Sequence, residues 1–391
     1  MSAAAPSAFR VVAPLGLAQL IGYGGAYYMP AILAAPIGRD LGLPPTATFA
    51  GLSGALLISS FMGPRVGRHV DGGGARALLV AANICFAAGL ALIAAAQGPW
   101  LLAAGWIVMG LGMGLGFYET AFAALTLLYG VKARNLISGV TLIAGFTSTV
   151  GWPVTAVLEQ HFGWRAACLA WAAANILIAL PLNLLLPNAA RMKTRETAPT
   201  EEPPAPADAP ETRRAMIAVA VMFAATSFVS SGLSAVMPNL LMSFGLTATA
   251  AIAASALVGP AQIVGRLSEM FVLRRYHPVI SARLACVFLP IGVVLFAWVG
   301  PALATPFVLL YALGNGILTI CRGTLPLAIF GPHGYGHRVG VLSAPSRISG
   351  ALAPLLLGML IDASAPASLW TAGVLNIVGF AALAFVAARA R

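Results

Sequence analysis

Apolar segments of roughly 20 or more residues recur along the whole chain, separated by short stretches that contain proline, glycine and charged residues. A helix of about 20 residues is long enough to cross the roughly 30 Å hydrocarbon core of a bilayer. The short alternating segments of a β-barrel are not seen, and an open sheet would leave backbone groups unsatisfied in lipid. The sequence therefore predicts an all-α membrane protein.

The composition supports this fold class and argues against others. The chain is 60% hydrophobic and 8% charged, whereas soluble domains carry about 25% charged residues. The formal net charge is +11, but Lys and Arg lie between the apolar segments instead of along one face, so we expect no nucleic-acid partner. The four cysteines show no CxxC spacing, which predicts buried thiols rather than a disulfide framework or a zinc site.

Breaks in the apolar pattern divide the chain into twelve candidate helices. With both termini in the cytoplasm, most Lys and Arg residues fall on the cytoplasmic side, and only Arg39 and Arg165 lie clearly outside. This asymmetry follows the positive-inside rule and favours an even number of spans. The first apolar segment runs to about Pro36 without a cleavage pattern after it, so we expect a retained span instead of a signal peptide.

One extended polar and proline-rich segment, RMKTRETAPTEEPPAPADAPETRR, lies between the sixth and seventh helices. Such a composition cannot bury enough apolar surface to fold alone, so it predicts a flexible cytoplasmic linker. We expect an N-terminal six-helix bundle at residues 1–187, a linker at 188–214 and a C-terminal six-helix bundle at 215–391.

The two halves repeat a short motif. GRHVD, from Gly67 to Asp71, follows the second helix, and GRLSE, from Gly265 to Glu269, follows the eighth. Each follows a nearby Gly-Pro pair. An acidic residue four positions after a glycine in both halves indicates an internal repeat of the kind on which many transporters are built.

At this point the chain resembles the major facilitator superfamily over nearly all of its length. The loop signature of that superfamily reads Gly-x-x-x-Asp-basic-x-Gly-basic-basic, and GRHVDGGGAR matches it in part, with Gly72 and Ala75 in place of two basic residues. The resemblance implies two six-helix bundles that rock about a central cavity, with this loop latching one conformation. The latch residues it implies, with their echo in the second half, are Gly67, Arg68, Asp71, Gly74, Arg76, Gly265, Arg266 and Glu269.

Within this loop, we expect Asp71 to cap the start of the third helix and to attract cations such as Arg134. The alternative is a solvated turn with no further role. A second superfamily signature, a Gly-Pro pair in the fifth helix of drug and proton antiporters, is matched only loosely, because Trp152 separates Gly151 from Pro153. This departure argues against a drug exporter without excluding one.

Three charged residues, Glu119, Arg322 and Arg347, lie deep within predicted spans. Each costs about 2.5 to 3.5 kcal/mol at a helix centre if unpaired, so all three are expected to face a cavity. Glu119 and Arg322 each follow a Gly-x-Gly and lie at matching depths of the fourth and tenth helices, which line the cavity in the resembled fold. We expect them to confront each other there, with Arg347 at a similar level.

The guanidinium groups suit a carboxylate or phosphate on the substrate. Glu119 can take up a proton when substrate draws its cationic partner away, because a desolvated carboxylate that loses its counter-charge binds protons more tightly. The alternative is a fixed structural bridge or a gate between the bundles that never touches substrate. Polar residues at helical spacing extend the candidate substrate-binding set, which is Arg322, Arg347, Gln19, Tyr23, Tyr27 and Asn315. The alternative is that these polar rows, together with the serines of the seventh helix, serve helix packing.

Together these features predict a secondary active transporter of a small, monocarboxylate-like organic anion that works by alternating access with proton coupling. The alternatives are a proton-driven exporter of drugs or metabolites and, from another class, a membrane sensor, against which the short termini count. We expect no enzyme activity and no cofactor, and the sequence has no Walker loop for ATP. The two histidines of HGYGH, His333 and His337, have no third metal ligand nearby, so we interpret them as a chance loop pair. The alanine-rich composition resembles a bacterial protein, a monomer of the cell inner membrane.

Overall fold

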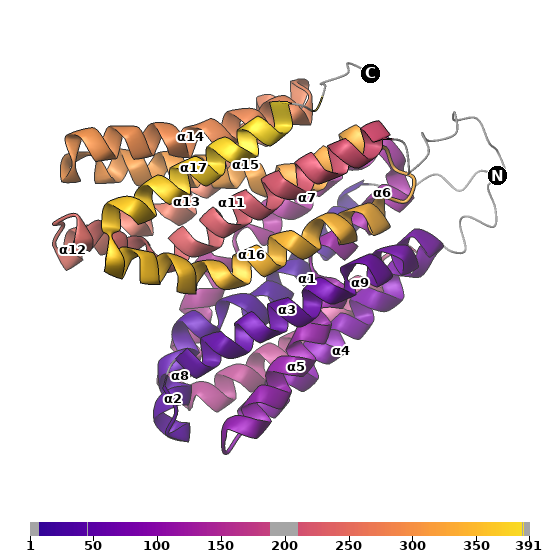
Figure 1. The fold of residues 1–391 in the computed structure, drawn as a ribbon. Coiled ribbons are helices and arrows are strands. Elements are labelled where there is room, and N and C mark those ends of the chain that lie inside the picture. The colour runs from indigo at the N-terminus through magenta and orange to yellow at the C-terminus, as the bar shows by residue number, and fades with distance from the viewer. Residues whose placement is uncertain (1–7, 45, 188–209, 385, 387–391) are drawn as a thin grey trace. The chain divides into compact units, whose positions relative to one another are not determined.

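The computed structural model describes residues 8–44, 46–187, 210–384 and 386. Every regular element in these ranges is a helix (Figure 1), which confirms the predicted all-α class. Most of the predicted linker and both ends of the chain lie outside the described residues.

The structure separates into two compact units. Unit 1 lies within Met1–Pro203 and Gly331–Val341, and unit 2 lies within Pro204–Phe330 and Leu342–Arg391. Residues 331–341 therefore pack with the first half of the chain, although the helix that they begin continues in unit 2. The predicted bundle boundaries stay a prediction.

The described helices of each unit follow one another with short connections. Those of the first half are α1 (Ala8–Tyr23), η1 (Gly24–Tyr28), α2 (Pro30–Leu41), α3 (Thr46–His69), η2 (Val70–Gly74), α4 (Ala75–Ala94), α5 (Pro99–Gly116), α6 (Tyr118–Tyr129), η3 (Gly130–Lys132), α7 (Ala133–Ala144), α8 (Thr147–Ala174), η4 (Asn175–Ala179) and α9 (Leu180–Leu184). Those of the second half are α11 (Pro210–Ser243), α12 (Ala248–Ala256), α13 (Val258–Phe271), η5 (Leu273–Arg275), α14 (Pro278–Val299), η6 (Pro301–Leu303), α15 (Ala304–Phe330), α16 (Tyr335–Ala363) and α17 (Ala365–Ala384). The η labels mark π-helices in η1, η2 and η4 and 3₁₀-helices in the others.

Eight helical stretches of the described residues are long and apolar enough to cross a membrane, and the bent pair of α1–η1 and α2 makes a ninth. Two of these stretches contain more than one crossing. Gly73 (φ 100°) breaks the stretch Thr46–Ala94 between α3 and α4, and Gly163 (φ 81°) breaks α8 into two segments. With α5–α6 taken as one broken span, the described residues hold the twelve predicted spans.

Glycines let one helix of each unit pack closely between two others. On α5, a Cβ at Gly110 would lie 2.9 Å from the Ala55 carbonyl of α3, and one at Gly112 would lie 2.8 Å from the Phe86 ring of α4. On α15 in unit 2, a Cβ at Gly314 would lie 2.7 Å from the Ala285 carbonyl of α14. The glycines that precede Glu119 and Arg322 in the sequence thus serve helix packing in both units.

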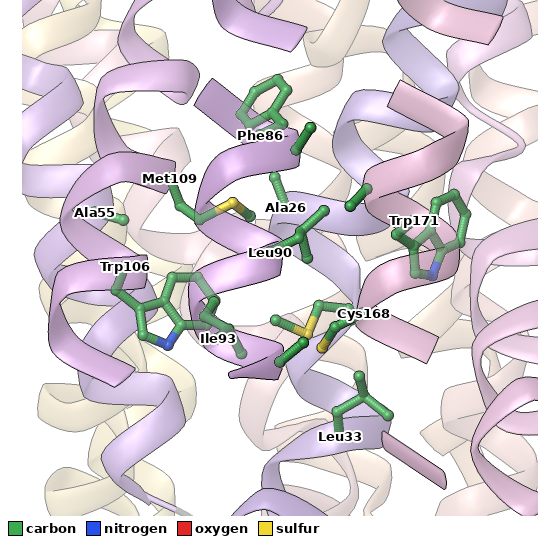
Figure 2. Packing of buried hydrophobic residues seen from close by; sticks show 14 of the residues in the cluster. Ala26, Leu33, Ala55, Phe86, Leu90, Ile93, Trp106, Met109, Cys168 and Trp171 are labelled. Carbon is green, nitrogen blue, oxygen red and sulfur yellow. The ribbon is translucent and has the colours of Figure 1, made fainter. Parts of the chain in front are cut away.

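The core of unit 1 lies among α2, α3, α4, α5 and α8. Figure 2 shows Phe86, Leu90 and Ile93 of α4 next to Met109 and Trp106 of α5, with Trp171 and Cys168 of α8 on the other side of α4. Trp106 is 2% exposed and Cys168 is fully buried. Cys286 and Cys321 of unit 2 are buried as well, whereas Cys85 is partly exposed.

Candidate functional site

The fourth predicted span is broken in its middle at a single residue. α5 ends at Gly116 and α6 begins at Tyr118, and Phe117 between them is extended (φ −76°, ψ −174°). The break leaves backbone carbonyls at the end of α5 and backbone N–H groups at the start of α6 without partners within their helices. Irregular backbone at this depth is tolerated only where protein or water satisfies it.

Gln19 of α1 satisfies part of the break. Its Nε2 donates a hydrogen bond of 2.7 Å to the Gly116 carbonyl, and the Gln19 side chain is 3% exposed. Gly116 is itself so close to the Ala82 side chain of α4 that no Cβ fits. Gln19, predicted to bind substrate, therefore lies at the break as a structural partner of α5, and its role toward substrate stays a prediction.

Aromatic rings surround the break. Tyr23 stacks on Phe117 with ring centroids 4.0 Å apart and planes 8° apart, and it lies 4.8 Å from the Tyr118 ring. Tyr27 meets Tyr23 edge to face at 6.2 Å, and Tyr118 stacks on Phe122 at 5.1 Å. Tyr23, Tyr27 and Tyr118 remain partly exposed, whereas Phe117 and Phe122 are buried.

Glu119 lies in the first turn of α6, two residues after the break, and is partly exposed. A carboxylate is favoured at this place because the N-terminus of a helix carries a partial positive charge. The sequence did not reveal this local reason, because no proline or other strong signal marks Phe117 as a helix end. The partial positive charge at the start of α6 therefore adds to the stabilisation that we expect from the predicted partners of Glu119.

In unit 2, a polar stripe runs along α15. Between Gly314 and Leu327 the partly exposed residues are Asn315, Thr319 and Arg322, and the other residues of this stretch are buried. Their spacing of four and three puts them on one helix face. Arg347 of α16 is also partly exposed. The predicted pairing of Glu119 with Arg322 and Arg347 joins residues of different units and stays a prediction.

Two serine side chains of the seventh span bind neighbouring helices. Ser231 Oγ donates to the Gly350 carbonyl of α16 at 2.7 Å, and Ser234 Oγ lies 2.8 Å from the Tyr311 hydroxyl of α15. Tyr311 also donates to the Ser230 carbonyl at 2.9 Å. These contacts agree with the helix-packing alternative for the serine row.

The η2 segment after α3 makes a specific contact with the start of α16. The two carboxylate oxygens of Asp71 accept hydrogen bonds from the backbone N–H groups of Gly336, at 2.8 Å, and His337, at 2.9 Å. His337 Nδ1 lies 3.2 Å from the Pro64 carbonyl of α3. Since a carbonyl only accepts, Nδ1 donates here. Asp71 thus satisfies two N–H groups at the positive end of α16.

Glycines bring the two backbones together beside this contact. A Cβ at Gly63 would lie 2.6 Å from the Gly340 carbonyl, and one at Gly336 would lie 2.6 Å from the Gly67 carbonyl. Both helices therefore carry a Gly-x-x-x-Gly pair, Gly63 with Gly67 and Gly336 with Gly340, at their crossing. Such pairs allow close approach of membrane helices. We call Gly63, Gly67, Asp71, Gly336 and Gly340 the glycine crossing.

The prediction that Asp71 caps the third helix is wrong. α4 begins after Gly74, which makes no side-chain cap, and Asp71 is used by a helix that starts 264 positions later. Its predicted attraction for Arg134 stays a prediction. Of the other expected latch residues, Arg68 is exposed, Gly74 and Arg76 are partly exposed, and Gly265, Arg266 and Glu269 of α13 are buried.

Residues 15–337 match the family described as Major Facilitator Superfamily. The chain belongs to the Major Facilitator Superfamily. A search of curated protein sequences finds no match.

Solved structures of this superfamily share the fold. The human organic anion transporter MFSD10 (TETRAN) aligns with a TM-score of 0.73 at 17% identity, over 97% of this chain and 100% of that one. FucP in the outward conformation gives 0.72 at 14% identity, over 97% and 99%. The proton:xylose symporter XylE bound to 6-bromo-6-deoxy-D-glucose gives 0.71 at 14% identity, over 96% and 94%. At these identities the likeness concerns the fold alone.

Three polar features of this superfamily member were missed by sequence reasoning. Asn183 donates to Asn83 at 2.7 Å, Asn83 donates to Asn175 at 3.1 Å, and Asn175 donates to the Trp171 carbonyl at 3.0 Å, all buried between α4, η4 and α9. The Arg165 guanidinium pairs with the Asp40 carboxylate and donates to the Ala96 carbonyl at 3.0 Å.

The third missed feature is His337, which was expected in a chance loop pair. It lies instead in the first turn of α16, bound to Asp71 and Pro64. In the sequence, the glycines at a spacing of four around it were the only signal of a close helix crossing.

Proposed function

We propose that this protein is a secondary active transporter that moves a small organic anion, of the monocarboxylate kind, by alternating access coupled to protons. The observation that carries the proposal is the polar stripe of α15, where Arg322 is partly exposed while its neighbours on the helix are buried. A charged residue in a membrane span that is held on an accessible polar face marks a pathway for substrate or ions.

Arg322 is suited to bind the anionic group of the substrate. Its planar guanidinium offers several N–H donors in a fork that matches a carboxylate. Asn315 lies on the same face and can supply a further hydrogen bond, and Arg347 of α16 can supply a second cation. Two cationic groups in unit 2 favour an anion over a cation or a neutral sugar.

Glu119 is suited to carry the proton. It is the acidic residue in the first turn of α6, partly exposed, and bordered by the aromatic side chains around Phe117. A carboxylate in such surroundings changes its proton affinity strongly when a nearby cation arrives or leaves. The fold relatives include an organic anion transporter and two sugar:proton symporters, FucP and XylE, which supports both parts of the proposal.

The Asp71 contact is suited to stabilise one conformation of the cycle. A movement of α16 away from α3 has to break two charge-assisted hydrogen bonds and the glycine crossing together. An element held in this way can alternate between a bound and an open arrangement, as alternating access requires.

A second candidate is a proton-driven exporter of lipophilic cations. The aromatic rings of Tyr23, Tyr27 and Tyr118 near Glu119 favour it, because tyrosine faces attract cations and a carboxylate neutralises them. In that case Glu119 exchanges its proton for the cation, and Arg322 only modulates the site.

Proteoliposomes with an imposed pH gradient separate the two candidates. An organic anion transporter takes up radiolabelled monocarboxylates when the gradient is imposed, whereas a cation exporter extrudes a fluorescent lipophilic cation. We expect Arg322→Ala to lower anion uptake at least tenfold and Arg322→Lys to retain part of it, because lysine keeps the charge without the fork. The matched control is Arg275→Ala, an exposed arginine of η5.

The coupling residue has its own test. Glu119→Gln should abolish the dependence of uptake on the pH gradient while exchange of labelled for unlabelled anion continues. Uptake by Glu119→Gln that still follows the gradient at the normal rate contradicts the proton assignment, and normal anion affinity in Arg322→Ala contradicts the binding assignment.

A further inference from the structure

Tyr335 is the first residue of α16 and is 1% exposed. Its phenol lies beside the hydroxyl of Thr126 on α6 and within electrostatic range of the Glu119 carboxylate. Thr126 is 2% exposed. A buried tyrosine hydroxyl thus lies next to the helix that carries the intramembrane acid, a position that no sequence pattern indicates.

Glu119, Phe122 and Thr126 share one face of α6. Their spacing of three and four residues stacks them along the helix, and the seven residue steps from Glu119 to Thr126 correspond to a rise of about 10.5 Å. The phenol of Tyr335 therefore adjoins the face of α6 that carries Glu119.

The two residues that follow Tyr335 are those that bind Asp71. Gly336 and His337 donate their backbone N–H groups to its carboxylate. All three belong to the first turn of one helix, so a shift of the Tyr335 ring is passed through the backbone to both hydrogen bonds.

We propose that Tyr335 couples the protonation of Glu119 to the contact between Asp71 and the start of α16. The proposal rests on the proposed role of Glu119 as the proton carrier. Tyr335 acts as a positioning residue, because it neither carries the proton nor binds the substrate.

The sign of the coupling follows from electrostatics. Ionised Glu119 attracts the hydroxyl dipole of Tyr335 and the positive end of α16, and so holds the first turn in place. When a proton adds to a carboxylate oxygen of Glu119, the charge is lost while no other bond changes. The first turn is then held less firmly, and the Asp71 contact opens more often.

Other charged or titratable side chains also lie on the elements that meet here. They include His69, Asp71, Lys132, Arg134, Tyr129, His333, His337 and Arg338. A change of pH does not act on Glu119 alone. The test therefore imitates protonation by Glu119→Gln at constant pH.

Hydrogen exchange of the amides in residues 335–341 of the full-length protein reports the Asp71 contact directly. We expect Glu119→Gln to speed their exchange about fivefold or more, the lower end of ordinary coupling between sites. In a Tyr335→Phe background, which removes only the hydroxyl, exchange is already faster and Glu119→Gln adds nothing further. The matched control is Tyr276→Phe, which removes the hydroxyl of an exposed tyrosine of unit 2 and should leave the Glu119→Gln effect unchanged.

Thr126→Val provides a second variant on the same contact and should halve the Glu119→Gln effect or more. The proposal is overturned if Glu119→Gln leaves the exchange of 335–341 unchanged, or if its effect persists in full with Tyr335→Phe. Either result is independent of transport, because exchange is measured without substrate. Loss of gradient-driven uptake without this exchange pattern therefore rejects Tyr335 alone and retains Glu119 as the proton carrier.

Discussion

Oδ1 of Asp71 lies 2.8 Å from the backbone nitrogen of Gly336, a residue 265 positions further along the chain. The hydrogen bond joins η2 to the first turn of α16, and a second hydrogen bond from the His337 N–H to Oδ2 accompanies it. An anion at a helix N-terminus is favoured by about 0.3 to 1 kcal/mol at exposed sites and by up to about 2 kcal/mol when partly buried. Asp71 is partly buried, which places the contact toward the upper end.

We predict that Asp71→Asn weakens this contact. The asparagine amide retains one acceptor oxygen but turns N–H donors toward the helix N–H groups, so one hydrogen bond and the charge are lost. Amide exchange in residues 335–341 should rise about tenfold, equivalent to about 1.4 kcal/mol. Asp362→Asn, at an exposed aspartate near the other end of α16, should leave this exchange unaltered, and equal effects of the two would speak against the contact.

Gly67→Ala should disturb the glycine crossing. The added methyl group has no room beside the Gly336 carbonyl, so the helices must separate at a cost of about 1 to 3 kcal/mol. Thermal unfolding of the purified protein measures this loss. Gly72→Ala is the matched control, because nothing lies within 4 Å of a Cβ at that position, and its effect should stay within about 0.5 kcal/mol.

Gln19→Met should destabilise the helix break. Methionine has a similar length but cannot donate to the Gly116 carbonyl, which is left buried and unsatisfied at a cost of about 1 to 3 kcal/mol. The change is measured as a lower unfolding temperature, with Gln97→Met, at an exposed glutamine, as the control. An unaltered unfolding temperature in Gln19→Met would show that the hydrogen bond contributes nothing.

The buried asparagine chain predicts an order of effects. Asn83 is its central member, since it accepts from Asn183 and donates to Asn175. Asn83→Leu breaks both hydrogen bonds, whereas Asn183→Leu breaks one, and each bond is worth about 0.6 to 2 kcal/mol between membrane helices. The unfolding temperature should therefore fall further for Asn83→Leu than for Asn183→Leu. The reverse order would contradict the chain of asparagine hydrogen bonds described above.

We predict that Arg165 contributes more to the stability of the fold than its acidic partner Asp40. Both side chains of the Arg165–Asp40 pair are more than 40% exposed, so the ion pair itself contributes at most about 1 kcal/mol. Asp40→Asn should have little effect on thermal unfolding. Arg165→Met also loses the hydrogen bond to the Ala96 carbonyl and the stacking 4.2 Å above the Trp164 ring, and should cost clearly more.

The architecture was predictable from the sequence because it depends on local quantities. The length and apolarity of each segment predicted the twelve spans, and the repeated GRHVD and GRLSE motifs predicted two related halves. Glu119, Arg322 and Asn315 were singled out as candidates because a charged or amide side chain is conspicuous in an apolar segment, and their roles stay predictions. The partly exposed stripe of α15 agrees with the helical spacing on which they were chosen.

The rest depends on contacts that no local pattern encodes. The sequence around Asp71 predicted a cap on the nearest helix, but its partner lies on the eleventh span. The break at Phe117 has no proline, and Gln19 satisfies it from another helix. Tyr335 is an ordinary tyrosine at a helix start in the sequence, and only its burial beside Thr126 distinguishes it.

The glycine crossing has a consequence for kinetics. Backbones that meet at glycines separate with few rotamer changes, so little steric resistance opposes opening once the hydrogen bonds of Asp71 and of the His337 ring are broken. Attraction at such short range also fades within an ångström or two. Opening should therefore be abrupt, with no half-open intermediate that lingers, and single-molecule traces across α3 and the start of α16 should show two levels with sharp steps between them.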